Sequence, residues 1–315
     1  MNRFSATILL LATLLLAACA AGSGTLGPVA TPPPTAEPSI DAPSAEPTPG
    51  ETAAPGGTGE PGASPQETAA TTTTVRAYFF LGSFTDNSGL VPVLRQVPKT
   101  SAVGAAAMNA LLAGPNDTEL GARPAMYTVV PEGTRFLGLT IDGGVATVNL
   151  SREFESGGGS ASVLGRLAQV VYTLTQFPTI TGVRFELDGQ PVTTFSGEGV
   201  VLDGPVGRTD YTDFLPAIWV DRPAWGGVLG NPGRVTGLAN VFEAAFNVAT
   251  LDAADRSLVD VPAMATCGTG CWGTFDVTIP YSVSAAQWGT LRVYDLSAND
   301  GSPEHVVEYP VWLTP

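Results

Sequence analysis

The stretch that decides the fold is residues 131–154, which read PEGTRFLGLTIDGGVATVNLSREF. Two runs of alternating apolar and polar residues flank Asp142-Gly143-Gly144, and glycine readily adopts the positive φ angles that a tight hairpin turn requires. A glycine-rich segment follows at 155–160, then a helical repeat of apolar residues to about Gln176, then an alternating run at 183–188. This order predicts a β-hairpin that is joined by a helix to a further strand.

The chain before this hairpin predicts two more strands and another helix. Residues 75–81 and 90–97 alternate as strands do, and Pro92 favours an edge position because proline cannot donate a hydrogen bond to a neighbouring strand. Residues 101–112 gather Val, Ala and Leu on one helical face, and the Thr-Ser pair at 100–101 is the expected N-cap. The complete order predicts an α+β domain with its helices on one face of a small sheet.

From about Ala217 onward the periodicity is that of strands alone. Short alternating runs recur to the end of the chain and are separated by turn residues. Such spacing predicts an antiparallel β-sandwich. The expected strands are residues 218–221, 234–240, 243–251, 257–261, 273–281, 289–296 and 306–313.

Residues 1–18 have the organisation of an export signal. Arg3 provides a positive charge, and the apolar run at 6–16 is too short to span a bilayer as a mature helix. The run ends in Leu16-Ala17-Ala18-Cys19, which resembles the bacterial lipobox; this implies acylation of Cys19 and cleavage before it. Two or three acyl chains such as palmitate anchor a protein stably, so we expect an extracytoplasmic protein on the cell membrane. The alternative is a plain secretory signal with an incidental cysteine.

Residues 19–74 have the composition of a disordered linker. Between 20 and 74 the chain has no Lys, Arg or aromatic residue, and Pro, Thr, Ala, Gly, Ser and Glu dominate. Such a segment cannot bury enough apolar surface to offset its loss of conformational entropy. We expect a spacer that holds the folded domains away from the membrane. A proline-rich docking site for another protein is the alternative.

The charge of the chain argues against nucleic acid as a partner. The net charge is −15, and Lys99 is the sole lysine. Binding to phosphates requires a basic stripe that neutralises them, and the sequence contains none. We interpret the acidic surface as one that keeps an exported protein soluble.

Two families resemble the folded part of the chain. Residues 75–201 resemble the GerMN (sporulation and spore germination) domain, which implies an α+β fold like that of ring-building domains, no enzyme activity and an extracytoplasmic location. Residues 216–315 resemble the immunoglobulin-like domain that accompanies GerMN in spore-germination-type proteins. The first resemblance rests on residues 112–115 (LAGP), 130–134 (VPEGT), 145–154 (VATVNLSREF) and 170–177. The second rests on residues 240–244 (NVFEA), 273–275 (GTF) and 299–302 (NDGS).

Cys267 and Cys271 are the only cysteine pair in the region expected to fold. Outside the cytoplasm a disulfide between them is reasonable, and the intervening glycines let the two sulfurs meet. Two free thiols are the alternative. We expect no zinc site here, because such a site needs about four ligands and His305 is the only histidine.

The sequence predicts neither catalytic residues nor a cofactor. A Ser-His-Asp site would have to use His305, which lies between turn residues and the last strand, and no Gly-x-Ser-x-Gly motif is present. The carboxylate pairs Glu153/Glu155 and Glu186/Asp188 are the only visible candidates for glycosidase chemistry, and on strands such pairs more often face solvent. The Gly-Gly-Gly-Ser loop at 157–160 lacks the lysine of a phosphate-binding loop, and we interpret it as a flexible connection.

All five tryptophans lie in the C-terminal region: Trp219, Trp225, Trp272, Trp288 and Trp312. Exposed tryptophan rings stack against sugars, although most should fill the core of the sandwich. Trp225, between Pro223 and two glycines, is the expected exposed ring and glycan contact. The Asn-Asp-Gly at 299–301 lacks the ligand spacing of a calcium loop and predicts a turn.

These observations predict four segments: a lipoprotein signal (1–18), a linker (19–74), a GerMN-like domain (75–205) and an immunoglobulin-like sandwich (216–315). We expect a lipid-anchored, non-enzymatic envelope protein of the sporulation or germination type. Its expected partners are the membrane, through Cys19, envelope proteins or cell wall, and other copies of itself. A cell-wall glycan-binding lipoprotein is the alternative, and an unusual hydrolase comes third.

Overall fold

The computed structural model describes residues 71–83 and 89–315. The expected signal, Cys19, the linker up to residue 70 and most of the turn expected at 86–89 lie outside these residues. Within the described ranges, no helix combines the length and the hydropathy that crossing a bilayer would require.

The N-terminal domain contains two main sheets where one was expected. In the first, with order β2-β1-β3, all pairs are antiparallel and β2 lies at an edge, as Pro92 predicts. The second has the order β4-β5-β6-β7, and its β5–β6 pair is parallel. The strands are β1 (Thr72–Leu81), β2 (Leu90–Pro98), β3 (Met126–Tyr127), β4 (Phe136–Asp142), β5 (Val145–Leu150), β6 (Gly182–Leu187) and β7 (Gln190–Pro191), with a separate pair β8 (Thr194–Phe195) and β9 (Val200–Val201).

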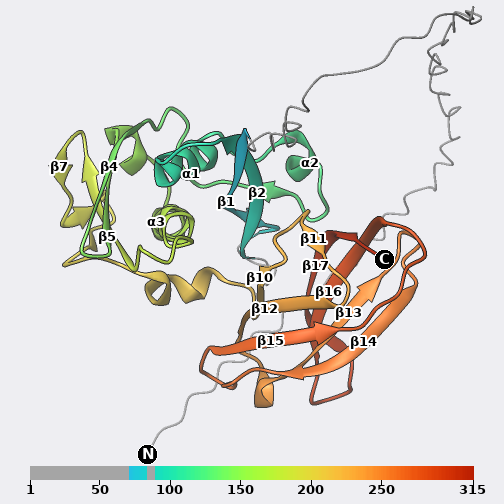
Figure 1. Ribbon diagram of the computed structural model, residues 1–315. Coiled ribbons are helices and arrows are strands. Elements are labelled where there is room, and N and C mark those ends of the chain that lie inside the picture. Colours follow the sequence, from blue (N-terminus) through green and yellow to red (C-terminus); the bar gives the residue numbers. More distant parts are fainter. Residues whose placement is uncertain (1–70, 84–88) are drawn as a thin grey trace, which may run out of the picture. The chain divides into compact units, whose positions relative to one another are not determined.

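The helices α1 (Val103–Leu112) and α3 (Ser160–Leu174) lie between these two sheets (Figure 1). Each contacts β1 of the first sheet, while α1 also contacts β4 and α3 contacts β6 of the second. The prediction of helices on one face of a single sheet was therefore wrong. The physical reason lies in α3, in which every residue from Val163 to Leu174 except Leu164 is buried. A helix that is buried all round must be covered on more than one face.

The β4–β5 hairpin forms as predicted. Gly143 and Gly144 make the turn with φ angles of 54° and 84°, a combination that glycine tolerates and other residues resist. The Thr181 amide donates to the Gly144 carbonyl at 2.8 Å, which ties the turn to the start of β6. Residues 131–154 thus set the register of the second sheet.

The helix ends differ slightly from the prediction. Ala102 is the N-cap residue of α1, and the Thr100 hydroxyl accepts a hydrogen bond from the Ala102 amide without capping the helix itself. The short α2 (Asp117–Leu120) has a complete capping box between Asn116 and Glu119. The Glu119 carboxylate also accepts hydrogen bonds from both terminal nitrogens of Arg95 at 2.6 Å, which makes a nearly buried bidentate ion pair.

The C-terminal domain is a β-sandwich, which confirms the predicted class. Its three-stranded sheet has the order β10-β12-β15, and its five-stranded sheet has the order β11-β17-β16-β13-β14. The short β11, which pairs in parallel with β17, was not predicted. The strands are β10 (Ile218–Arg222), β11 (Val228–Leu229), β12 (Gly233–Ala239), β13 (Ala245–Leu251), β14 (Ser257–Met264), β15 (Gly273–Ile279), β16 (Gln287–Leu296) and β17 (Pro303–Leu313).

Polar contacts join β10 and the loop after it to the N-terminal domain. The indole nitrogen of Trp219 donates to the Leu90 carbonyl at 2.9 Å, and the Trp225 amide donates to the Pro92 carbonyl at 2.9 Å. Asp221 pairs with Arg76 at 3.1 Å. The contacts of Trp219 and Trp225 cover the open edge of β2, which would otherwise present unpaired carbonyls.

Candidate interaction surface

The five-stranded sheet of the C-terminal domain turns one side to the core of the sandwich. We call its other side the outer face. Along β16, Leu291 and Val293 are fully buried, whereas Thr290, Arg292 and Tyr294 alternate with them and are partly exposed. This alternation follows from the two-residue period of a strand.

Paired polar side chains hold the centre of the outer face. Arg292 donates to Glu308 at 2.6 Å across β16 and β17. Asp260 of the edge strand β14 accepts hydrogen bonds from Tyr294 at 2.6 Å and from Asn247 at 3.0 Å. Partial burial and the bond to Asp260 raise the pKa of Tyr294 to about 12, so its phenol stays protonated and donating at neutral pH.

A shallow apolar cleft opens at one end of the outer face. It has a volume of about 630 Å³, and its lining includes Phe242, Met264 and Leu296. These three side chains are 57%, 71% and 51% exposed. Large apolar side chains that gather on a surface, where water must solvate them, mark sites at which other molecules bind.

The disulfide loop positions one wall of this cleft. Cys267 and Cys271 form a disulfide bond in the structure, with Cα atoms 5.8 Å apart. Within the loop, the Thr269 amide donates to the Val241 carbonyl at 2.9 Å and its hydroxyl accepts from the Glu243 amide at 2.9 Å. The loop thereby holds the short 3₁₀ helix Phe242–Ala244 and presents the Phe242 ring at the cleft.

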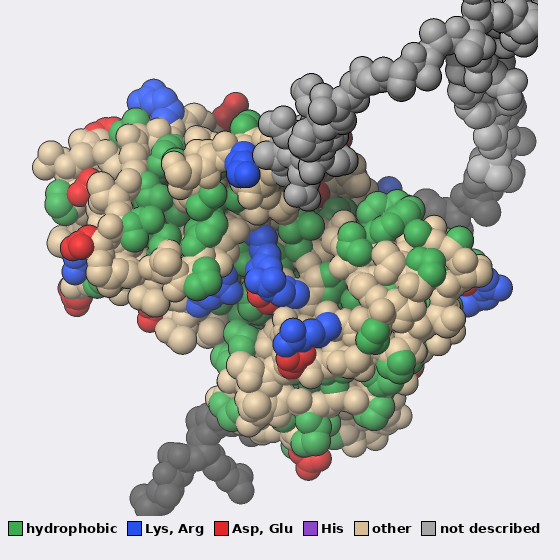
Figure 2. All heavy atoms as spheres, in the orientation of Figure 1, with side chains coloured by type: hydrophobic (Ala, Val, Ile, Leu, Met, Phe, Trp, Pro, Cys, Tyr) green, Lys and Arg blue, Asp and Glu red, His purple; other side chains and the backbone are tan. Residues whose placement is uncertain are grey.

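The exposed tryptophan is not the one that the sequence indicated. Trp288 on β16 is 52% exposed, and its ring meets that of Trp312 on β17 edge-on, with centroids 5.3 Å apart. Trp225 is only partly exposed, because it packs beside β2 of the N-terminal domain. Trp219 is buried and Trp272 is partly buried. Figure 2 shows hydrophobic side chains gathered on the C-terminal domain, over the region where Figure 1 places the C-terminus.

The candidate glycosidase carboxylates have the environment of surface ion pairs. Glu153 lies 3.9 Å from Arg135, and Arg152 lies within 4 Å of both Glu155 and Asp188. A hydrogen bond from the Ser151 hydroxyl lowers the pKa of Glu153, whereas a general acid needs a raised pKa. This arrangement does not favour acid catalysis at Glu153.

The glycine loop before α3 is held more firmly than expected. The guanidinium of Arg166, only 1% exposed, donates to the carbonyls of Phe154, Ser156 and Gly157 at 2.8–2.9 Å. At the helix start, the Ser160 hydroxyl donates to the carboxylate of Glu198 at 2.6 Å. The chain's own carboxylate therefore lies where a bound anion was considered.

Two further predicted features lie in the β16–β17 hairpin. The Asn-Asp-Gly segment forms a turn, in which Asp300 accepts a hydrogen bond from the Ser302 amide at 3.0 Å. His305 is exposed, and its Nδ1 lies 2.8 Å from the buried carboxylate of Asp295. Sequence reasoning missed this contact, and it missed Met264 and Leu296 as parts of the cleft, because only long-range strand pairing brings these segments together.

Comparisons with known proteins identify both domains. Residues 76–193 match the family described as sporulation and spore germination, and residues 217–302 match the family described as the immunoglobulin-like domain of bacterial spore germination. A comparison with curated proteins found no match.

Two solved structures resemble parts of the chain. The first GerMN domain of the sporulation protein GerM from Bacillus subtilis is 20% identical, with 44% of this chain and 99% of that chain covered and a TM-score of 0.37. The tandem GerMN domains of the same protein are 16% identical, with 67% of this chain and 63% of that chain covered and a TM-score of 0.36.

Proposed function

We propose that this chain, in which a GerMN domain is followed by the immunoglobulin-like domain of bacterial spore germination, is a non-enzymatic interaction module of sporulation or germination. It is held outside the cytoplasm by a lipid on Cys19, at the end of the lipobox-like segment. The linker between Cys19 and β1, which begins at Thr72, places the two domains at a distance from the membrane.

The observation that carries the interaction role is the apolar cleft beside β14. Three large apolar side chains, Phe242, Met264 and Leu296, expose more than half of their surface on one small area. The adjacent β14 is an edge strand of its sheet, so its backbone also offers hydrogen-bonding groups to a partner. A protein partner can thus use both apolar contact and strand pairing at this cleft.

The carboxylates of the N-terminal domain support a non-enzymatic role. Glu153, Glu155 and Asp188 form exposed ion pairs with arginines, and the pKa of Glu153 is lowered. Turnover of a cell-wall substrate that disappears in Glu153→Gln would contradict this part of the proposal.

Site-specific crosslinking in the native bacterium tests the cleft. A photocrosslinking amino acid at Met264 should capture one defined envelope protein, whereas the same group at Thr278, exposed on β15 of the other sheet, should not. Equal capture at both positions, or capture at neither, would contradict the assignment of this cleft.

The lipid anchor requires a separate test. Metabolic labelling with a palmitate analogue should mark the wild-type protein and leave Cys19→Ala unlabelled and released from the membrane fraction. A labelled Cys19→Ala protein would show that the lipobox assignment is wrong while leaving the cleft proposal intact.

Self-association has its own structural support in the N-terminal domain. The edge strand β4 exposes Leu137 and Ile141 by 45% and 51%, and edge strands with apolar side chains readily pair with a second chain. Sedimentation over a range of concentrations should show association that Ile141→Lys abolishes. A strict monomer at high concentration would exclude this form of assembly.

Glycan binding remains the second candidate because Trp288 is exposed against Trp312. Sugar rings stack on such surfaces. Co-sedimentation with insoluble cell wall should then fall in Trp288→Ala and much less in Trp225→Ala, because Trp225 is partly buried. Wall binding that is unchanged in both variants would eliminate these rings as the glycan contact.

A further inference from the structure

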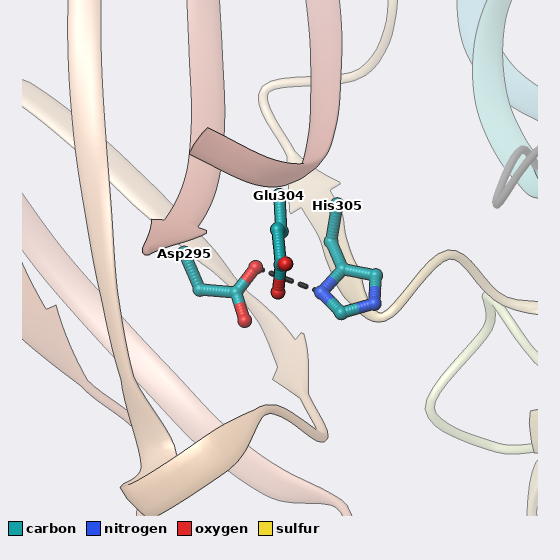
Figure 3. Close-up of side chains that lie close together, drawn as sticks. All are labelled: Asp295, Glu304 and His305. Atoms are coloured by element: carbon teal, nitrogen blue, oxygen red, sulfur yellow. Dashed lines mark hydrogen bonds and ion pairs between the residues drawn. The ribbon is translucent and has the colours of Figure 1, made fainter. Parts of the chain in front are cut away.

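Three metal-ligating side chains converge at one end of the β16–β17 hairpin: Asp295, Glu304 and His305 (Figure 3). One ligand atom from each lies within 4.8 Å of the other two. The Nδ1 atom of His305 is 2.8 Å from Oδ1 of Asp295. In Figure 3 both carboxylates and the imidazole ring turn toward the same small region of space.

A β-bulge makes this convergence possible. Val293 pairs with Val307 and Asp295 pairs with Glu304, so β17 contains one more residue than β16 between these two pairs. His305 has a positive φ of 50° at this point. Consecutive side chains of a regular strand point to opposite faces, whereas a bulge can turn one of them. Glu304 and His305 therefore both face Asp295.

Among the described residues, no lysine or arginine offsets the negative charge of this cluster. Asp295 is only 4% exposed, and among the described residues its carboxylate has no hydrogen bond or ion pair other than that to His305. Within the same described ranges, neither Asp295 nor Glu304 forms an ion pair with a lysine or arginine. Two carboxylates thus face a single imidazole, and burial of a carboxylate is costly unless a cation or donors compensate it.

We infer that Asp295, Glu304 and His305 bind a divalent transition metal ion, with Zn²⁺ as the best fit. An imidazole together with two carboxylates suits Zn²⁺, whereas Ca²⁺ and Mg²⁺ prefer oxygen ligands alone. Around a tetrahedral Zn²⁺ the ligand atoms lie about 3.3–3.5 Å apart, so small side-chain rotations from the present separations suffice. Water or a ligand from a partner completes the coordination, since Glu304 and His305 are reached from solvent.

The bound ion ties together the two strands beside the apolar cleft. Leu296, which lines the cleft, follows Asp295 directly in β16. A count of histidines and cysteines alone predicted no metal site. The two carboxylates provide ligands that such a count omits, and neither could be assigned to His305 before the register of β16 and β17 was known. The inference stands apart from the proposed function.

Titration calorimetry with Zn²⁺ tests the site. The full-length chain, carrying Cys19→Ser to remove the thiol outside the disulfide, is first treated with a chelator and then titrated. We expect one Zn²⁺ per chain, and binding at least about tenfold weaker in His305→Ala and in Asp295→Asn. Glu308→Gln, a matched carboxylate change on the outer face of the same β17, should bind Zn²⁺ like the parent.

The results of these titrations either support or contradict a Zn²⁺ site at Asp295, Glu304 and His305. Circular dichroism first establishes that each variant is folded. If Asp295→Asn is not folded, the result for His305→Ala decides, because the His305 side chain is exposed. Saturable binding that depends on His305 supports the site. Weak unsaturated binding, or binding unchanged in His305→Ala, would overturn it. Tighter binding of Ca²⁺ than of Zn²⁺ would overturn the assignment of the metal class.

Discussion

Helix α3 of the N-terminal domain and the outer face of the C-terminal sheet use polar side chains in opposite ways. In α3, the buried Gln169 accepts a hydrogen bond from the Val129 amide at 3.0 Å and donates one to the Tyr78 carbonyl at 2.8 Å. The helix is thereby tied to β1 and to the loop after β3. Arg166 similarly satisfies the carbonyls of the preceding loop. On the outer face, the polar pairs lie across strands at the surface and leave large apolar side chains exposed beside them.

Helix α3 therefore serves as structural framework, whereas the outer face serves as a surface for binding partners. Buried polar groups that are satisfied within the chain fix one arrangement of helix and strands, and their loss destabilises the fold. Exposed apolar groups add little to stability and are available to another molecule. We therefore expect substitutions in α3 to change the free energy of unfolding, and substitutions at the cleft to change binding.

The largest expected effect is that of Arg166→Met. The variant keeps the apolar stem but leaves the Phe154, Ser156 and Gly157 carbonyls without their donor. The Phe154 carbonyl is buried, whereas Ser156 and Gly157 are exposed to water. Because an unsatisfied buried group costs about 1–3 kcal/mol, the free energy of unfolding should fall by up to about 3 kcal/mol. Urea denaturation followed by circular dichroism measures the change.

Arg184→Met provides the matched control, since Arg184 is exposed on β6 and has no hydrogen bond or ion pair among the described residues. Its free energy of unfolding should change by less than about 0.5 kcal/mol. Equal effects of the two substitutions would show that the hydrogen bonds of Arg166 do not stabilise the glycine loop.

The disulfide should contribute less. Replacing both Cys267 and Cys271 with serine opens a short loop, and the chain-entropy model assigns such a loop about 2 kcal/mol. The melting temperature should fall, and capture at the cleft should weaken because the loop positions Phe242. Lower stability with undiminished capture would separate the disulfide from the interaction surface.

At the cleft itself, a substitution should weaken partner binding without lowering the stability of the fold. Met264→Ser should change the free energy of unfolding by less than about 0.5 kcal/mol, because the side chain is 71% exposed. Crosslinking from a group placed at Leu296 should nevertheless decrease in this variant. A marked loss of stability would mean that Met264 belongs to the core and would remove the contrast drawn between the two regions.

The smallest expected effect concerns pH. Asp252, in the β13–β14 turn, has a lowered pKa because the Arg256 side chain and the amides of Arg256 and Ala254 donate to its carboxylate. A lowered folded-state pKa gives stability that is present above the unfolded pKa of about 4 and is lost as pH falls through the folded pKa.

Asp252→Asn should therefore be less stable than the parent at pH 7, and its stability should decline less between pH 4 and pH 2. Urea denaturation at several pH values measures this. Asp203→Asn, at an exposed carboxylate without a side-chain partner among the described residues, is the control. An unchanged acid decline in Asp252→Asn would show that these hydrogen bonds do not stabilise the turn.

The local elements were largely predictable, because each follows from a short-range cause. The glycines at 143–144 dictate the hairpin, Pro92 excludes a central strand, and alternation marks the strands of the sandwich. The incorrect prediction of a single sheet in the N-terminal domain has an equally plain cause. Periodicity shows which face of an element is apolar, but it does not say what covers that face.

The sequence by itself determined the two fold classes, the order of the longer elements and the disulfide-permitting spacing of Cys267 and Cys271, since these depend on residues that are neighbours in the chain. Only the tertiary structure decided that α3 lies between two sheets, that Trp288 is the exposed tryptophan, and that Asp295 meets His305. Each of these depends on strand register and packing between distant segments. Such contacts arise from the burial of many side chains at once, and no single motif records them.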